Sequence, residues 1–465
     1  NVDSSNANEG TLTLSGSTTV SGTVGSTNSL KVINTGAAST TSTFDDSVAS
    51  TTINIDSGTV NFNGNVTSTI NFTNDGNIAF SNITYIGDIK GNTGSISAND
   101  NVFIEGNVSA KALNILSGKE VDISSGDVSL DDINFADNSS ILSLSGSNDQ
   151  VVTVSSINDG QVKVSGSGNR TINASLGDNV TSFSSVLLSG SNKTTFNGDQ
   201  YITSLGFSSD EILFNNNANI TNNLLFTKNG QIITTGSGSN FAGNVDLGSY
   251  SGTIINVVAL KDDSFVGDIA VSGVNGSLTL GGAYKTTFEG IIGVDGSNKL
   301  SEIDIKSGSS AVFNKSIYAN STNLDGSGEV LFKSSISTNF NFAADGSITL
   351  SDGANITGSV DNLSGVSNKG SLTLSGSTTV SGVVGSTKAL KQITAGATGS
   401  TSIFANAVSA AAISIGSGEV DFNKSVTGNI NFTADGKVVI AGGYNITGNV
   451  DSSNANEGTL TLSGS

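Results

Sequence analysis

One short pattern recurs along the whole chain: an apolar residue, a spacer, a small or polar residue, a spacer, and then an aliphatic residue. Neighbouring copies begin about 18 to 25 residues apart. The copies begin at Val20, Phe44, Phe62, Tyr85, Ile104, Ile172, Phe196, Ile220, Phe241, Phe265, Phe288, Phe313, Phe332, Ile356, Val380, Phe404, Phe422 and Ile446. The long gap from Ile104 to Ile172 fits three steps, with two degenerate copies near positions 130–140 and 151–157. The chain therefore repeats one small structural unit about 20 times.

The residues around each copy alternate between apolar and polar side chains with a period of two, as in TLTL at Thr11–Leu14 and TVNF at Thr59–Phe62. This alternation is typical of β-strands. A step of about 22 residues is too short for helical-hairpin repeats of about 33 to 47 residues, and the leucine-rich pattern is absent. The sequence predicts an all-β protein, a right-handed parallel β-helix (β-solenoid) of about 20 coils of about 22 residues each.

The abundance of Gly, Ser and Asn raises disorder as an alternative, which the strict patterning of the apolar residues excludes. The chain has 58 Gly and no Pro, as expected for continuous strand pairing that is broken by tight corners. Residues 53–66 (INIDSGTVNFNGNV) illustrate one coil, with a turn at 56–58 and a corner at 63–64. The side chains expected to point inward are Ile53, Ile55, Val60, Phe62 and Val66. Because Phe recurs in the pattern, we expect aromatic stacks along the core.

The chain also repeats itself on two longer scales. Residues Asn449–Ser465 are identical to Asn1–Ser17, and Gly10–Phe80 matches Gly370–Ile440 at an offset of 360. We expect residues 1–465 to form a single continuous β-solenoid, comprising one tandem unit (1–448) and the opening segment (449–465) of the next. The expected partner is therefore the chain itself, through end-to-end continuation or stacking of identical units. With coils about 4.8 Å apart, 20 coils predict a rod of roughly 95 Å.

The charge and the missing residue types exclude several functions. The net charge is −20, from 19 basic and 39 acidic residues, which disfavours nucleic acid and anionic membranes as partners. No apolar run approaches the roughly 18 residues of a membrane span. Without His and Cys, the chain can form neither a Ser-His-Asp triad nor a thiol nucleophile nor a zinc site of the usual ligands. We therefore expect no enzyme activity.

Acidic residues are the remaining candidates for chemistry, and we interpret them as solvated corners. Three adjacent pairs occur, at Asp45/Asp46, Asp131/Asp132 and Asp262/Asp263. Adjacent strand residues point to opposite faces, so these pairs do not form a two-carboxylate glycosidase site. The glycine-rich calcium nonapeptide and the EF-hand loop are both absent. The sequence predicts no catalytic, cofactor-binding or metal-binding residue and no cofactor, and it leaves calcium binding and glycosylation open.

Two segments resemble a known family in sequence. They are GSLTLSGSTTVSGVVGS at 370–386 and SGEVDFNKSVTGNINFTADGKVVIAGGYNITGNV at 417–450. Both resemble the passenger repeats of rickettsial surface antigens, which are the large autotransporter outer-membrane proteins A and B. The resemblance implies a β-helical domain that is displayed on the bacterial surface and works in adhesion, host-cell entry or a surface layer. The long tandem period of this chain departs from the short repeats of that family, which leaves open a fibre-forming relative in place of a typical adhesin.

Two functions follow as predictions. The first is a non-enzymatic cell-surface structural protein, a β-solenoid stalk or filament subunit of a bacterial surface fibre that serves adhesion. The alternative is an autotransporter passenger adhesin that binds a host or neighbour-cell receptor, with the irregular stretch 130–156 as the candidate contact. Both place the chain outside the cell, on the bacterial surface, and neither involves nucleic acid or a membrane span in this segment.

Overall fold

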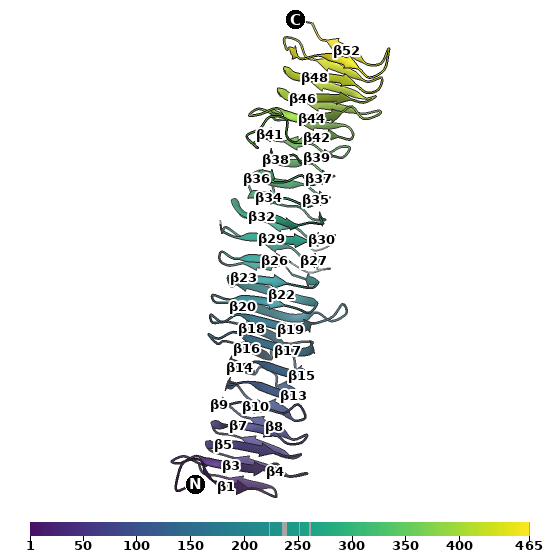
Figure 1. The fold of residues 1–465 in the computed structure, drawn as a ribbon. Helices are drawn as coiled ribbons and strands as arrows, with labels where there is room; N and C mark the ends of the chain where they lie inside the picture. Colours follow the sequence, from purple (N-terminus) through teal and green to yellow (C-terminus); the bar gives the residue numbers. More distant parts are fainter. Residues whose placement is uncertain (223, 235–239, 251, 260–261, 465) are drawn as a thin grey trace. The chain divides into compact units, whose positions relative to one another are not determined.

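In the computed structural model, every regular element is a β-strand and the strands stack in parallel as the turns of a β-solenoid (Figure 1). The structure describes residues 1–222, 224–234, 240–250, 252–259 and 262–464. In these residues there is no helix, and so none that is long and apolar enough to cross a membrane. The predicted fold class is confirmed, with about 22 turns in place of about 20.

The chain divides into two compact units, Asn1–Leu224 and Leu225–Ser465, and each is described by itself. The continuity of one solenoid over residues 1–465 stays a prediction.

The first unit contains strands β1 to β24 and the first residue of β25. Their bounds are β1 (Glu9–Thr13), β2 (Thr18–Val20), β3 (Leu30–Thr35), β4 (Thr41–Phe44), β5 (Val48–Ile55), β6 (Thr59–Phe62), β7 (Val66–Phe72), β8 (Asn77–Phe80), β9 (Ile83–Ile86), β10 (Ile89–Lys90), β11 (Ser95–Ala98), β12 (Val102–Glu105), β13 (Val108–Ile115), β14 (Glu120–Ser125), β15 (Val128–Phe135), β16 (Ile141–Leu144), β17 (Gln150–Ile157), β18 (Gln161–Val164), β19 (Arg170–Leu176), β20 (Phe183–Ser189), β21 (Lys193–Phe196), β22 (Gln200–Ser208), β23 (Glu211–Phe214), β24 (Ala218–Ile220) and β25 (Leu224–Phe226).

The second unit contains the strands from β26 onward. Their bounds are β26 (Gln231–Thr234), β27 (Phe241–Ala242), β28 (Val245–Asp246), β29 (Ile254–Ala259), β30 (Asp263–Val266), β31 (Ile269–Ala270), β32 (Val274–Gly282), β33 (Lys285–Phe288), β34 (Lys299–Ile305), β35 (Ser310–Phe313), β36 (Ile317–Leu324), β37 (Glu329–Phe332), β38 (Ile336–Phe342), β39 (Ser347–Leu350), β40 (Ile356–Thr357), β41 (Val360–Asn362), β42 (Ser371–Leu374), β43 (Thr378–Val380), β44 (Leu390–Ala395), β45 (Thr401–Phe404), β46 (Val408–Ile415), β47 (Glu419–Phe422), β48 (Val426–Phe432), β49 (Lys437–Ile440), β50 (Ile446–Thr447), β51 (Val450–Ser452) and β52 (Thr459–Leu462).

Each coil of the first unit can be followed along one core column, meaning a set of inward side chains that pair directly from coil to coil. Successive members lie one coil apart in the sequence and are in parallel register. The column consists of Leu12, Ile33, Ile53, Ile70, Ile89, Val108, Val128, Val152, Ile172, Phe196 and Phe214. The two degenerate copies predicted between Ile104 and Ile172 therefore correspond to the coils of Val128 and Val152.

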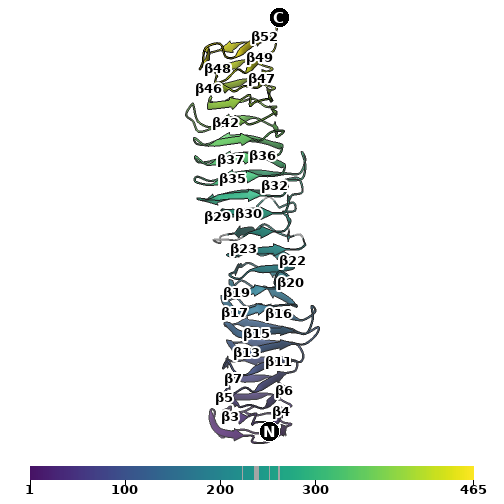
Figure 2. The same cartoon turned by 90° about the vertical axis from the view of Figure 1, so that its right-hand side faces the viewer.

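The second unit has a core column of the same kind, again with one member in each coil. It consists of Ile232, Ile255, Leu278, Ile303, Thr322, Phe340, Val360, Val384, Val408, Val426 and Ile446. Strands β46 and β48 pair in this register and lie on adjacent layers in both views (Figures 1 and 2). Each unit thus has about half of the turns.

The predicted coil at 53–66 is confirmed residue by residue. All five side chains that were expected to point inward have a relative exposure of 0%. They come from β5, β6 and β7, which are separated at 56–58 and 63–65. The alternation read from the sequence therefore gives the correct inward residues of this coil.

The succession of pattern copies from coil to coil was partly wrong. Phe62 stacks in register under Phe80 of the next coil, and not under Tyr85. Tyr85 instead pairs with Val66, which is the last residue of the pattern copy that begins at Phe62. The first and the last residue of a pattern copy both point inward and belong to two adjacent core columns. The next copy along the sequence can therefore begin in either of these columns. The same shift separates Phe332 from Ile356 and Phe422 from Ile446, and it explains why counting copies gave too few coils.

Aromatic stacks run through the core of each unit, as predicted. In the second unit, Phe241, Phe265, Phe288, Phe313 and Phe332 form a continuous series with ring centroids 4.7 to 5.6 Å apart and interplanar angles of 11° to 29°. In the first unit, Phe44 and Phe62 stack with ring centroids 5.3 Å apart, and Phe80 follows Phe62 at 5.9 Å with its ring tilted by 39°. Ring pairs at these separations add to the stabilisation from burial alone.

In several pattern copies, among them YIGDI at 85–89 and IEGNV at 104–108, the corner is a glycine followed by Asn or Asp. Gly87 and Gly106 lie above one another with φ of +138° and +150°, which is a region that L side chains rarely adopt. The next residue binds the following coil, because Asp88 accepts a hydrogen bond from the backbone N–H of Asn107 at 3.0 Å, and Asn107 accepts one from that of Asp127 at 2.9 Å. The corner N–H groups are thereby satisfied where strand pairing stops.

We expect Gly106→Ala to lower the midpoint of thermal unfolding, with a loss of stability on the order of 2 kcal/mol or more. A Cβ at this position would lie 1.9 Å from the carbonyl oxygen of Gly87. Gly16→Ala is the control, because a Cβ there has no atom within 4 Å. Differential scanning calorimetry of both variants tests this, and an unchanged midpoint for Gly106→Ala would contradict the stacked corner.

The only arginine of the chain, Arg170, is buried in the core of the first unit with a relative exposure of 0%. It follows Gln150 in register, so a polar pair interrupts an otherwise apolar face of β17 and β19. Its guanidinium donates hydrogen bonds to five backbone carbonyl oxygens at 2.8 to 3.4 Å, those of Leu144, Gly146, Asn148, Ser165 and Asn169. Arg170 therefore joins the loops of two successive coils, and nothing in the repeat pattern predicted it.

We expect Arg170→Ala to destabilise the first unit by at least about 3 kcal/mol, because several buried carbonyls lose their donors. Hydrogen exchange should rise first in the loops at 144–149 and 165–169. Lys193→Ala is a matched control that removes a cation from the neighbouring surface, where Lys193 pairs with Glu211, and such a pair contributes about 0–1 kcal/mol. Equal effects of the two substitutions would refute the role of Arg170 as a core clamp.

The irregular stretch 130–156 is part of the solenoid. Its strands β15, β16 and β17 pair in parallel with strands of the coils before and after. The step from Val128 to Val152 is longer than the step from Val108 to Val128, and the extra length is taken up at the corners. The stretch is therefore a long coil of the solenoid wall.

Candidate functional site

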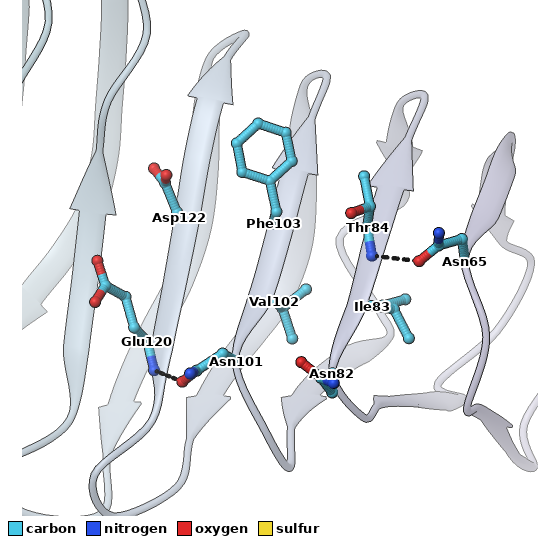
Figure 3. Close-up of a pocket in the computed structure, with 9 residues that line it drawn as sticks. All are labelled: Asn65, Asn82, Ile83, Thr84, Asn101, Val102, Phe103, Glu120 and Asp122. Atoms are coloured by element: carbon cyan, nitrogen blue, oxygen red, sulfur yellow. Dashed lines mark hydrogen bonds between the residues drawn. The ribbon is translucent and has the colours of Figure 1, made fainter.

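The candidate site is a shallow groove on the outer surface of the first unit, formed by four successive coils (Figure 3). Its volume is about 360 Å³. Nine residues line it: Asn65, Asn82, Ile83, Thr84, Asn101, Val102, Phe103, Glu120 and Asp122. Strands β9, β12 and β14 supply most of these residues, and Asn65 precedes β7.

Strand alternation and parallel register place the side chains. In β12, Val102 and Ile104 are buried while Phe103 points outward with 37% of its surface exposed. Phe103 pairs in register with Thr84 on one side and with Asp122 on the other. These three outward side chains therefore form a row across the coils, although each comes from a different coil.

Two asparagines at the edge of the groove are fixed by the backbone of the next coil. The side-chain oxygen of Asn65 accepts a hydrogen bond from the N–H of Thr84 at 2.9 Å, and that of Asn101 accepts one from the N–H of Glu120 at 3.0 Å (Figure 3). Because each oxygen is held in this way, the amide NH₂ of each side chain is directed elsewhere and can donate to a ligand.

The two carboxylates of the groove differ in their surroundings. Glu120 forms an ion pair with Lys163 at 3.3 Å. Burial raises the pKa of Asp122, and the nearby charge of Glu120 adds to the increase, against a hydrogen bond from Ser145 at 2.8 Å. The other oxygen of Asp122 is buried without a hydrogen-bond partner. Lys163 thus compensates one charge of the groove, and the second is poorly solvated.

A second Glu-x-Asp strand shows what distinguishes this groove. In β47 of the second unit, Glu419 pairs with Lys437 at 2.8 Å, and burial raises the pKa of Asp421. However, Asp421 has Ile403 and Val439 as its register neighbours, where Asp122 has an aromatic ring. Glu302 and Asp304 of β34 form a third strand of this kind, and Asp304 has Thr279 and Asn323 as its register neighbours. Of these three acidic strands, only β14 has an aromatic ring beside its Asp.

The groove has the groups of a binding surface. Glycoside hydrolysis needs one carboxyl group that protonates the leaving oxygen and a second that acts as base or nucleophile. Here Glu120 is paired with a lysine, one oxygen of Asp122 is buried without a partner, and the other accepts a hydrogen bond from Ser145. The prediction that the chain is not an enzyme stays a prediction.

The acidic pairs named from the sequence lie elsewhere. Asp45 and Asp46 are exposed at a corner, as expected. Asp131 and Asp132 are both exposed but lie within β15, which corrects their placement at a corner. Strand β15 continues through the two aspartates because its pairing with β13 includes both Leu130, just before them, and Asp132 itself.

The third pair is described only in part. Asp262 lies 3.8 Å from the ammonium group of Lys285, and the side chain of Asp263 falls outside the described residues. In the part of the chain that the structure describes, no three acidic side chains gather as metal ligands would.

Sequence reasoning missed the groove because it considered adjacent carboxylates only. Glu120 and Asp122 are two positions apart on one strand, so they share a face. Residues i and i+2 of this kind could have been found by the same alternation that identified the core. The position of Phe103 beside them could not, because it depends on the register between β12 and β14.

Comparisons with known proteins give no relative for this chain: no family model, no curated protein and no solved structure matches it. The similarity to rickettsial passenger repeats therefore stays a prediction from the sequence.

We expect Asp122→Asn to raise the unfolding temperature at pH 7, because the substitution removes a buried, poorly solvated charge. The folded-state pKa of Asp122 lies above its ordinary value of 3.8, so its ionisation destabilises the folded protein once the pH exceeds that value. The advantage of the variant should therefore shrink as the pH falls toward 3.8. Unfolding midpoints of both proteins between pH 3.5 and 7 test this, and a difference that is independent of pH would contradict it.

Proposed function

We propose that this chain is a non-enzymatic structural protein of a bacterial cell surface, whose β-solenoid forms a stalk or filament that serves adhesion. A parallel β-solenoid buries each coil against its neighbours, so coils can be added without a new core. A protein of this kind extends by duplication, and its length is set by the number of coils.

The observation that carries the proposal is that duplicated segments fold in the same register. Val20 pairs with Phe44 in the first unit, and Val380 pairs with Phe404 in the second, at the offset of 360 seen in the sequence. The strands that follow even share a register shift, between Ala49 and Thr52 and again between Ser409 and Ala412. The duplicated segment thus forms the same strand pairings in both units.

The identical segments 1–17 and 449–465 support continuation by the same rule. Asp3 accepts a hydrogen bond from the backbone N–H of Thr27 at 3.1 Å, and Asp361 accepts the equivalent one from Thr387 at 3.0 Å. Each of these aspartates fixes a loop of the following coil. Asp451 is a third copy of this position, and a following tandem unit would supply the same loop to it.

Surface display is supported by the charge and by the resemblance. A net charge of −20 keeps an extended surface soluble and unreactive toward nucleic acid. The resemblance to autotransporter passengers favours a location outside a bacterial cell.

The alternative, a passenger adhesin that binds a receptor on a host or neighbouring cell, is favoured by one feature. The groove around Phe103 exposes an aromatic ring among polar groups, and such a position is suited to recognition. The two functions are compatible, because a stalk can carry a binding groove on its side.

The stalk proposal predicts that length scales with tandem units. On a coil spacing of about 4.8 Å, about 22 turns give roughly 100 Å. We expect electron microscopy of a chain with residues 1–448 placed before residues 1–465 to show rods about twice as long as those of residues 1–465 alone.

A matched chain with a flexible Gly/Ser linker between the two copies should bend at the linker, whereas the directly joined chain should not. Compact particles, or a directly joined chain that bends as freely as the linked one, would refute the stalk. Filaments that the single unit forms by itself would add self-association to the proposal.

A further inference from the structure

We propose that the groove around Phe103 binds a short stretch of neutral, hydroxyl-rich carbohydrate. The inference rests on the proposed surface function and deepens it by naming the ligand class that such a stalk would contact. It is carried by three features of the groove: an exposed ring, a mixed set of polar groups, and a length that spans several coils.

The ring is the first feature. In the described part of the chain, Phe103 is the only phenylalanine whose side chain is exposed, while Phe44, Phe62 and Phe80 have a relative exposure of 0–1%. An exposed phenyl ring lacks the stabilisation that burial gives. The apolar C–H face of a pyranose ring can cover such a side chain and recover part of this free energy.

The polar groups around the ring suit hydroxyl groups, which both donate and accept hydrogen bonds. The amide groups of Asn65 and Asn101 provide oriented NH₂ donors, since their oxygens are already occupied. Thr84 and Asn82 can donate or accept, and Glu120 accepts. Planar amides and carboxylates beside an aromatic ring give a site in which a few placed polar groups orient the ligand.

The charge of the groove favours a neutral ligand over a cationic peptide. Glu120 is compensated by Lys163 at 3.3 Å. Burial raises the pKa of Asp122, and no other lining residue is acidic. A site for lysine or arginine side chains would present several solvated, uncompensated carboxylates.

The dimensions fit an oligosaccharide. The lining residues come from four successive coils, so the groove runs over three coil steps of about 4.8 Å, or roughly 14 Å, which accommodates about three sugar rings. The groove is shallow, so we expect a weak single-site affinity, with a Kd in the range of about 0.1 to 1 mM. Repetition of the groove in tandem units would raise the apparent affinity through multivalency.

The test measures binding of chitotriose, cellotriose and maltotriose to residues 1–465 by saturation-transfer difference NMR and by titration calorimetry. We expect at least one of the three to bind. Phe103→Ala should weaken that binding at least tenfold and Phe103→Tyr should retain it, because tyrosine keeps the ring face. Asn101→Ala should weaken it to a smaller degree.

The matched control is Leu187→Ala. Leu187 is an exposed apolar side chain, 46% accessible, on the same outward row farther along the first unit, and it is outside the groove. Its removal should leave binding unchanged. Circular dichroism and unfolding midpoints establish that every variant is folded.

The inference is overturned if none of the three sugars binds at millimolar concentration, or if Phe103→Ala binds as well as the parent. It is also overturned if a lysine-rich peptide binds at this groove in a salt-dependent way while the sugars do not. None of these outcomes affects the rod lengths seen by electron microscopy, so failure of the carbohydrate site and failure of the stalk remain distinguishable.

Discussion

The structure depends on the direct stacking of each inward side chain on the equivalent side chain of the next coil. Parallel backbone pairing fixes the coils at one spacing, so each inward side chain packs directly against the one at the same register position of the next coil. The series from Phe241 to Phe332 satisfies this with one residue type repeated in register. Because the stacking is local, neither unit needs contacts between residues that lie many coils apart.

Corners carry the second constraint, because backbone pairing stops there. At Gly87 and Gly106, a positive φ lets one coil lie directly on the next, and the following Asp88 or Asn107 accepts a backbone N–H group of the next coil that the strands leave unpaired. The short recurring pattern of the sequence is therefore a corner with one inward residue on each side. Arg170 shows that the core tolerates an exception where loops supply enough carbonyl oxygens to surround a cation.

The outer face is under neither constraint, and this is where function can vary. Outward residues form rows in the same register as the core, so any four coils can place their side chains together. Glu-x-Asp strands occur in both units, but only β14 in the first unit has Phe103 beside its Asp together with the oriented amides of Asn65 and Asn101. A repetitive scaffold thereby carries a groove that the other two Glu-x-Asp strands, β34 and β47, do not repeat.

The sequence by itself determined the fold class, and for coils such as 53–66 it also determined the inward residues and the corners. These are encoded within a single coil, as Ile53–Val66 shows, because strand alternation and glycine conformations are local properties. The tertiary structure decided which residues of neighbouring coils pair with one another. Phe80 rather than Tyr85 follows Phe62, Arg170 is enclosed by the loops of two coils, and Thr84, Phe103 and Asp122 form one row. Each of these placements depends on how many residues of a coil lie in its strands and how many in its corners, and this division is decided by how the whole coil packs.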